Sequence, residues 1–167
     1  MRSAPAGQEP SLRVHTARHD GRTFISITGT GTWRESQQLL TLCDEARAAG
    51  EKSIVVDLSH CAHLDSTFLG VLHNIASGFD KDESCRFEIQ NLPRPLLQEM
   101  STLGLTNVLM HFRHEPVALP ESMLSVEGGA PAGEELGRLL LWAHEALVDA
   151  DPCNADRFAN VLAVLHQ

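Results

Sequence analysis

The chain has 167 residues, 43% of them hydrophobic, and a formal net charge of −9. Its length suits one domain or a domain with an appendage, and its apolar content is sufficient for a buried core. The negative charge argues against general binding to nucleic acid or to anionic membranes, because neutralising phosphates requires clustered Lys and Arg.

The apolar runs and the cysteines bear on the compartment. No run approaches the roughly 18 apolar residues of a spanning helix, so we expect no transmembrane segment. Residues 1–5 lack the apolar stretch of a secretory signal. The four cysteines lie far apart without a Cys-x-x-Cys pair, a pattern typical of reduced thiols. These features favour a cytoplasmic location.

A loose tail and an antiparallel hairpin are the first expected elements. Residues 1–10 include Pro, Gly, Ser and Gln and predict the tail. Residues 12–16 alternate in hydrophobicity, as a half-exposed strand does, and residues 24–28 predict a second strand that ends at Gly29. The Asp20-Gly21 pair between these strands is a strong signal for a hairpin turn.

A glycine-containing loop and a helix follow. The sequence Gly-Thr-Gly-Thr at residues 29–32 allows a phosphate-binding loop, and hence a small-ligand or nucleotide site. The alternative is a tight loop into a helix, because neither a third glycine at the dinucleotide spacing nor Gly-Lys-Ser/Thr follows. Thr32 and Glu35 have the spacing of a capping box, and Gly50 is placed to end the helix.

The stretch from residue 53 to residue 79 carries the strongest pattern. The apolar run at residues 54–58 predicts a strand buried on both faces. A polar connection at residues 60–63 then leads to a helix whose apolar residues recur at spacings of three and four. Asp65 and Ser66 fall at the helix start, where free N–H groups and the helix dipole would stabilise a phosphate.

Strands and helices continue to alternate over residues 86–112. Residues 86–90 alternate as a strand does, Pro93 and Pro95 suit the first turn of a helix, and Gly104 suits its end. Residues 108–112 suggest a short final strand. This alternation predicts right-handed crossovers and a largely parallel sheet after the opening hairpin.

Residues 113–133 are rich in Pro and Gly and predict a linker, with one short element around residues 123–126. Residues 134–167 predict a helical hairpin broken at Asp151-Pro152, with Asn154 as the cap of its last helix. Neither helix could bury its apolar stripe alone. The hairpin must therefore pack on the preceding domain, on a second copy in a homodimer, or on a partner.

Residues 64–71, Leu-Asp-Ser-Thr-Phe-Leu-Gly-Val, resemble the signature of STAS domains, which occur in sulfate transporters and anti-sigma-factor antagonists. The order of elements over roughly residues 12–112 also agrees. The resemblance implies an α/β domain over residues 11–112, with a mixed sheet and helices mainly on one face. Two departures stand out. The family usually has Gly where this chain has Phe68, and often has an acidic residue near residues 29–32.

The resemblance also implies a function, that of a bacterial anti-sigma factor antagonist. In the antagonists the first hydroxyl residue after the Asp is phosphorylated, which here is Ser66, with Thr67 as the secondary candidate. The unmodified form would bind a GHKL-type anti-sigma serine kinase, and a PPM-type phosphatase would reverse the modification. Asp65, Thr67, Phe68 and Leu69 would form the docking site. The protein would be substrate and ligand rather than enzyme, without a cofactor of its own.

Other interpretations of the same residues stay open. The chain is also compatible with a constitutive STAS subunit that docks on a membrane-associated ATPase, as in lipid-transport machines. From its position alone Ser66 fits a plain helix-capping residue better than a switch, and it is the resemblance to STAS domains that favours the switch. The Phe68 ring is expected to narrow access to Ser66 or to alter docking. A hydrolase is not expected, because the sequence has no Gly-x-Ser-x-Gly elbow around this serine.

A metal site is a weaker interpretation of the histidines before the motif. His60, Cys61 and His63 lie close together in sequence, and His73 would have to supply a fourth ligand. Tetrahedral sites usually show tighter paired motifs. We therefore expect solvated loop histidines and no metal.

Overall fold

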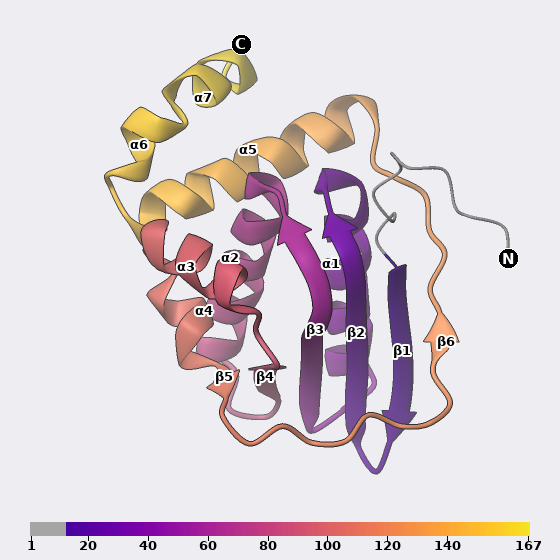
Figure 1. Cartoon of the computed structure of the whole chain (residues 1–167). Helices are drawn as coiled ribbons and strands as arrows, with labels where there is room; N and C mark the ends of the chain where they lie inside the picture. The colour runs from indigo at the N-terminus through magenta and orange to yellow at the C-terminus, as the bar shows by residue number, and fades with distance from the viewer. Residues whose placement is uncertain (1–12) are drawn as a thin grey trace, which may run out of the picture.

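A tight turn at Asp20 and Gly21 opens the fold. In the computed structural model, which describes residues 13–167, β1 (Arg13–His19) and β2 (Arg22–Gly31) pair antiparallel on either side of this turn (Figure 1). Both turn residues have positive φ, 51° and 73°, as two-residue hairpin turns require. The predicted hairpin is confirmed, and β2 runs on past Gly29. The predicted tail lies outside the described residues.

Parallel strands extend the sheet beyond β2. β3 (Ser53–Leu64), β4 (Arg86–Gln90) and β5 (Phe112–Arg113) follow one another in parallel register. On the other side β6 (Leu124–Ser125) pairs antiparallel with β1. The six-stranded order is β5-β4-β3-β2-β1-β6. The predicted mixed sheet, a hairpin followed by parallel strands, is confirmed.

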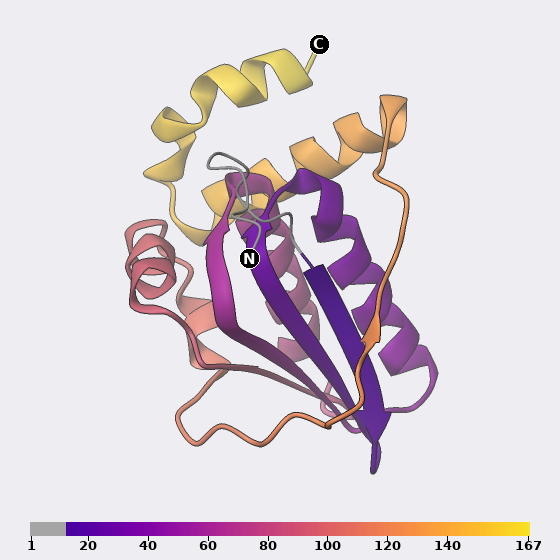
Figure 2. The same ribbon diagram turned by 45° about the vertical axis from the view of Figure 1, so that its right-hand side comes forward.

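Two helices cover one face of this sheet. α1 (Trp33–Ala48) and α2 (Ser66–Asp80) lie side by side on that face, as Figure 2 shows. The shorter α3 (Arg94–Thr102) and α4 (Thr106–Met110) follow β4 near the β5 edge (Figure 1). The predicted placement of helices mainly on one face is confirmed.

The predicted helix ends are also confirmed. Thr32 and Glu35 form the capping box that begins α1. Gly50, with φ of 75°, follows the end of α1. At the end of α3, Gly104 has φ of 68° and the N–H of Leu105 donates to the carbonyl of Met100 at 2.9 Å. That bond is the long one of a Schellman ending.

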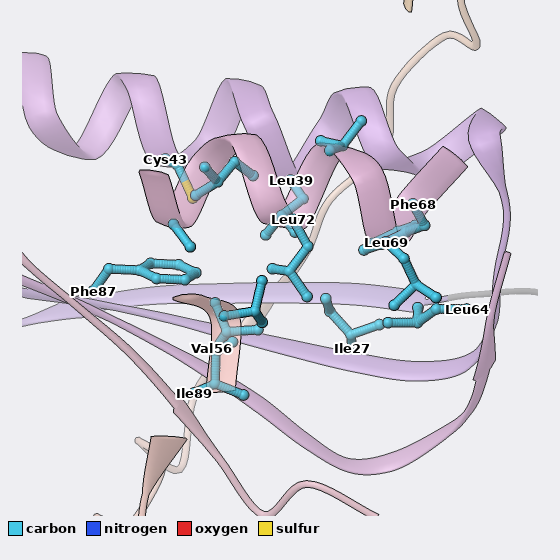
Figure 3. Close-up of a cluster of buried hydrophobic side chains, with 14 of the residues drawn as sticks. Ile27, Leu39, Cys43, Val56, Leu64, Phe68, Leu69, Leu72, Phe87 and Ile89 are labelled. Atoms are coloured by element: carbon cyan, nitrogen blue, oxygen red, sulfur yellow. The ribbon is translucent and has the colours of Figure 1, made fainter. Parts of the chain in front are cut away.

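The core lies between the sheet and the inner sides of α1 and α2 (Figure 3). The helices contribute apolar side chains that point at the sheet, and the strands contribute branched and aromatic side chains to the same cluster. Each such side chain stabilises the fold by about 1.5–3 kcal/mol when fully buried. The labelled members of this cluster are Ile27, Leu39, Cys43, Val56, Leu64, Phe68, Leu69, Leu72, Phe87 and Ile89.

Two predicted boundaries are wrong. Residues 60–63 are not a connection, because β3 continues to Leu64 and keeps pairing with β2 across two register irregularities. Residues 108–110 are not a strand but the end of α4, and β5 is only Phe112–Arg113. Val108 is buried while Met110 is 79% exposed, so their alternation reflects two sides of a helical turn.

The C-terminal residues form the predicted helical hairpin. α5 (Gly133–Ala150) lies across the top of α2, and α6 (Asn154–Arg157) and α7 (Ala159–Leu165) turn back beyond it (Figure 1). Leu139, Ala143 and Leu147 of α5 are buried, so α5 packs on the preceding domain. Over residues 13–167, no helix combines the length and apolar character needed to cross a membrane.

Asn154 does not cap the last helix as predicted. Its amide is buried and donates to the carbonyls of Leu103, at 2.8 Å, and Leu147, at 2.7 Å. These carbonyls belong to the C-terminal ends of α3 and α5, where helix carbonyls lack partners within the helix. Asn154 therefore fastens the two helix ends together.

A buried carboxylate fastens the segment after β5 to the sheet. Asp57 accepts hydrogen bonds from the side-chain amides of Gln90, at 2.9 Å, and Asn91, at 2.7 Å, and from the backbone of Ser59 at 3.0 Å. The Gln90 amide in turn donates to the carbonyl of Val117 and accepts from its N–H, both at 2.9 Å. The short element predicted near residues 123–126 is β6.

This network predicts a pH-dependent stability. Burial by itself would raise the pKa of Asp57, but hydrogen bonds from Ser59, Gln90 and Asn91 outweigh it and lower the pKa below the ordinary 3.8. Because the folded-state pKa is the lower one, Asp57 stabilises the fold above about pH 4 and loses that contribution as the pH falls. Asp57→Asn should cost about 2 kcal/mol in urea unfolding at pH 7 and less at pH 3.

Asp20→Asn is the matched control, because the Asp20 side chain is 85% exposed and Asn also tolerates positive φ. It should leave the acid dependence of the free energy of unfolding as it is in the unchanged protein. An equal loss at pH 7 and pH 3 for Asp57→Asn would contradict the prediction.

Candidate functional site

Asp65 joins the starts of two helices. It is the N-cap of α2, where its Oδ1 accepts from the N–H of Phe68 at 2.8 Å. Its Oδ2 accepts from the N–H of Trp33, the first residue of α1, also at 2.8 Å. The capping role predicted for Asp65 is confirmed, and one carboxylate fixes the separation of the α1 and α2 N-termini.

Ser66, the first residue of α2, contacts the C-terminal helix. Its Oγ lies 3.1 Å from Nε2 of His144 in α5, and this histidine is 3% exposed. The Nδ1 of His144 lies 2.7 Å from the carbonyl oxygen of Leu140. A carbonyl only accepts, so Nδ1 carries the proton in the neutral imidazole and Nε2 accepts from the Ser66 hydroxyl.

Sequence reasoning did not find His144. It lies 78 residues after Ser66, on a helix outside the resemblance to STAS domains. Its spacing of four from Leu140 is that of any two neighbours along one side of a helix. Only the packing of α5 on α2 brings the imidazole to the hydroxyl, and nothing local in the sequence signals it.

The other predicted docking residues are buried. Thr67 is 4% exposed, and Phe68 and Leu69 are fully buried. Figure 3 shows the Phe68 and Leu69 side chains pointing from α2 toward the sheet. In this arrangement Asp65 and Ser66 are the half-buried members of the predicted site.

Comparison with known proteins gives the family. A family model described as Mlab, STAS domain, matches residues 14–111. The chain belongs to the STAS domain family. Among curated proteins, none matches the chain. A solved structure of an anti-sigma factor antagonist from Mycobacterium paratuberculosis is similar at 23% identity and a TM-score of 0.47, covering 57% of this chain and 80% of that one.

Within this STAS domain, Gly31 accommodates the unusual Phe68. A Cβ at Gly31 would lie 2.6 Å from Leu64 and 3.1 Å from the Phe68 ring. The ring therefore fills space that the missing side chain at Gly31 leaves open. The Phe68 ring faces the core. The group in contact with the Ser66 hydroxyl is instead the imidazole of His144.

The loop at residues 29–32 enters α1 with its amides engaged. The N–H of Thr32 donates to Glu35 at 3.1 Å, that of Trp33 donates to Asp65, and that of Arg34 donates to the Thr32 hydroxyl at 3.3 Å. A phosphate-binding loop would need such N–H groups free for its ligand. The geometry favours the alternative of a tight loop into a helix.

The histidines before the motif lie on β3 rather than in a loop. His60 and His63 are exposed, while Cys61 points into the core and is 2% exposed. Burial raises the pKa of the Cys61 thiol to about 11, with a weaker opposing effect from hydrogen bonding with the backbone of His63. Across residues 13–167, no three His, Cys, Asp or Glu side chains gather as metal ligands would.

The site combines a serine hydroxyl, an imidazole and a helix N-terminus. The second hydrogen bond of the imidazole goes to the Leu140 carbonyl, whereas a serine hydrolase triad has a carboxylate at that place. The helix start favours a phosphoryl group on Ser66 through the helix dipole, while the N–H of Phe68 in the same turn is already bonded to Asp65. The neighbouring carboxylate of Asp65 opposes it.

The double contact of Asp65 predicts a large effect of its removal. Asp65→Ala leaves the N–H groups of Phe68 and Trp33 without their acceptor, and should lower the free energy of unfolding by about 2–4 kcal/mol. Asp65→Asn keeps one acceptor oxygen and should cost about half as much. Urea unfolding monitored by circular dichroism measures both, and an Asp65→Ala loss no larger than that of Asp65→Asn would contradict the bridging role.

Proposed function

We propose that this STAS domain is a phosphorylation-controlled protein-interaction module of the anti-sigma factor antagonist kind. Ser66 is the modified residue. The observation that supports this choice is its position: a hydroxyl directly after the Asp65 cap, at the start of α2, inside the residues that match the family model. Thr67, the secondary candidate, is 4% exposed and so less accessible than the half-buried Ser66.

In the proposed cycle the unmodified protein binds a GHKL-type anti-sigma serine kinase in the bacterial cytoplasm. The docking site is the start of α2, where Asp65 and Ser66 are half-buried, and the predicted contacts Thr67, Phe68 and Leu69 support it from the interior, since they are buried. A phosphoryl group on Ser66 adds about −1.5 to −2 charges and would weaken docking by repulsion and desolvation. A PPM-type phosphatase would restore the binding form.

The proposed module comprises residues 11–112, with residues 113–133 as its linker and residues 134–167 as an extension. The protein acts as ligand and substrate, and the kinase supplies ATP and magnesium. Homodimer formation would involve the outer side of the extension, since α7 has no buried residue and exposes Val161 and Val164.

The second candidate is a constitutive docking subunit of a membrane-associated ATPase. The hydrogen bond between Ser66 and His144 favours it, because a hydroxyl that is already engaged has a structural role without modification. In that case the protein would co-purify with a transporter ATPase and carry no phosphoryl group.

The proposed switch predicts one phosphoryl group on Ser66 in protein isolated from its own cells. Intact-mass measurement followed by fragmentation detects and places it. Ser66→Ala should abolish the modification completely, because the acceptor oxygen is gone, and Thr67→Ala should retain it. Phosphorylation that persists in Ser66→Ala would refute the acceptor, and protein that stays unmodified through growth and stress would favour the docking subunit.

A further inference from the structure

α5 covers one side of α2 at the proposed switch. Ser66, Gly70 and Asn74 are spaced four residues apart and therefore form one stripe along α2, here called the Ser66 stripe. α5 lies across the start of α2 in both overall views (Figures 1 and 2). Each of the three residues of the Ser66 stripe contacts one of three consecutive residues of α5, from Trp142 to His144.

The middle contact brings the two backbones together. Gly70 lies against the backbone of Ala143, and a Cβ at Gly70 would lie 2.6 Å from the Ala143 carbonyl carbon and overlap its oxygen. Ala143 is fully buried. Such close crossings need a small residue on each helix, so the two sequences fit one another at this point.

Polar bonds fix the helices on both sides of the Gly70 crossing. Ser66 donates to His144 at one end of the stripe, and at the other the amide of Asn74 donates to the Trp142 carbonyl at 3.3 Å. The bonded surface of α2 therefore has a defined pattern: a hydroxyl donor, a glycine gap and an amide donor. An amphipathic helix with a small residue at its crossing point matches that pattern.

α5 is an addition to the family fold. The residues that match the STAS family model end at 111, whereas α5 begins at Gly133. Residues 127–132 connect it to the last paired residues of β6, and extended they would reach about 20 Å. α5 can thus leave α2 while β6 stays in the sheet, once the hydrogen bond from Asn154 to the Leu103 carbonyl of α3 has opened.

We infer that the Ser66 stripe is a docking surface for an amphipathic helix, that α5 occupies it in the free protein, and that a helix of the partner replaces α5. This inference rests on the proposed function, since it makes Ser66 part of the contact with the partner. The apparent affinity for the partner is then the intrinsic affinity multiplied by the fraction of the protein in which α5 has left α2. While α5 occupies the stripe, the Ser66 hydroxyl is bonded to His144 rather than to the partner.

The test uses a fluorescein-labelled peptide with the sequence of residues 133–150, added to the full chain and followed by fluorescence anisotropy. The opening variant is Ala143→Glu, because a long charged side chain at the crossing prevents α5 from returning while α2 keeps its sequence. The peptide should bind Ala143→Glu at least tenfold more tightly than it binds the unchanged protein, whose stripe is occupied. The same peptide carrying Ala143→Glu should bind neither.

Two glycines of α2 provide matched controls in the opened protein. Adding Gly70→Ala should abolish peptide binding, because its Cβ meets the backbone of the incoming helix. Adding Gly78→Ala should leave binding unchanged, since its Cβ would lie 3.6 Å from Arg47, an ordinary contact, and would meet no atom of α5 within 4 Å. Both changes favour the helical state of α2 equally, so they differ only at the crossing.

Hydrogen exchange shows whether α2 survives the opening. In Ala143→Glu, and to a smaller degree in His144→Ala, exchange should rise in α5 while β2, β3 and α2 keep their protection. Loss of protection throughout the sheet would overturn the inference, because α5 would then be part of the fold. A folded Ala143→Glu that fails to bind the peptide would also overturn it. Neither result depends on a kinase, so failure here is distinct from failure of the phosphorylation switch.

Discussion

The carboxylate of Asp65 is the constraint on which the site depends. It accepts from the first turn of α2 and from the first residue of α1, so the two helices enter the sheet face at a fixed separation. Charge-assisted bonds of this kind are among the stronger ones in proteins. The position of Ser66, one residue later, follows from the same anchor. Asp65 thus caps α2 and at the same time sets the position of the Ser66 hydroxyl.

Two glycines allow the close packing around α2, because they have no side chain at positions where there is no room for one. Gly31 leaves room beneath α2 for the Phe68 ring, and Gly70 leaves room above α2 for the backbone of α5. α2 is therefore enclosed on two sides by close contacts that tolerate no added methyl group without movement. The chain combines a large aromatic residue at Phe68 with glycines at the two positions that must make room.

Features that depend on neighbouring residues could be predicted from the sequence. The Asp20-Gly21 turn, the capping box of α1 and the Schellman ending of α3 each involve a few consecutive residues. The extension of β3 to Leu64 depends instead on its pairing with β2. The polar residues in this stretch give no local signal of that pairing. The contact of Ser66 with His144 depends on where a separate helix packs. Contacts between residues that are far apart in the sequence leave no local pattern from which they could be predicted.

One segment closes both edges of the sheet. β5 and β6 lie at opposite ends of the strand order, and residues 114–123 join them along the lower end of the sheet in Figure 1. β6 interrupts the free edge of β1 at its centre, and β5 pairs only with the last two residues of β4. Long open edges invite strands from other chains. β6 and β5 therefore shorten the free edges of β1 and β4, which disfavours strand addition at these two outer strands.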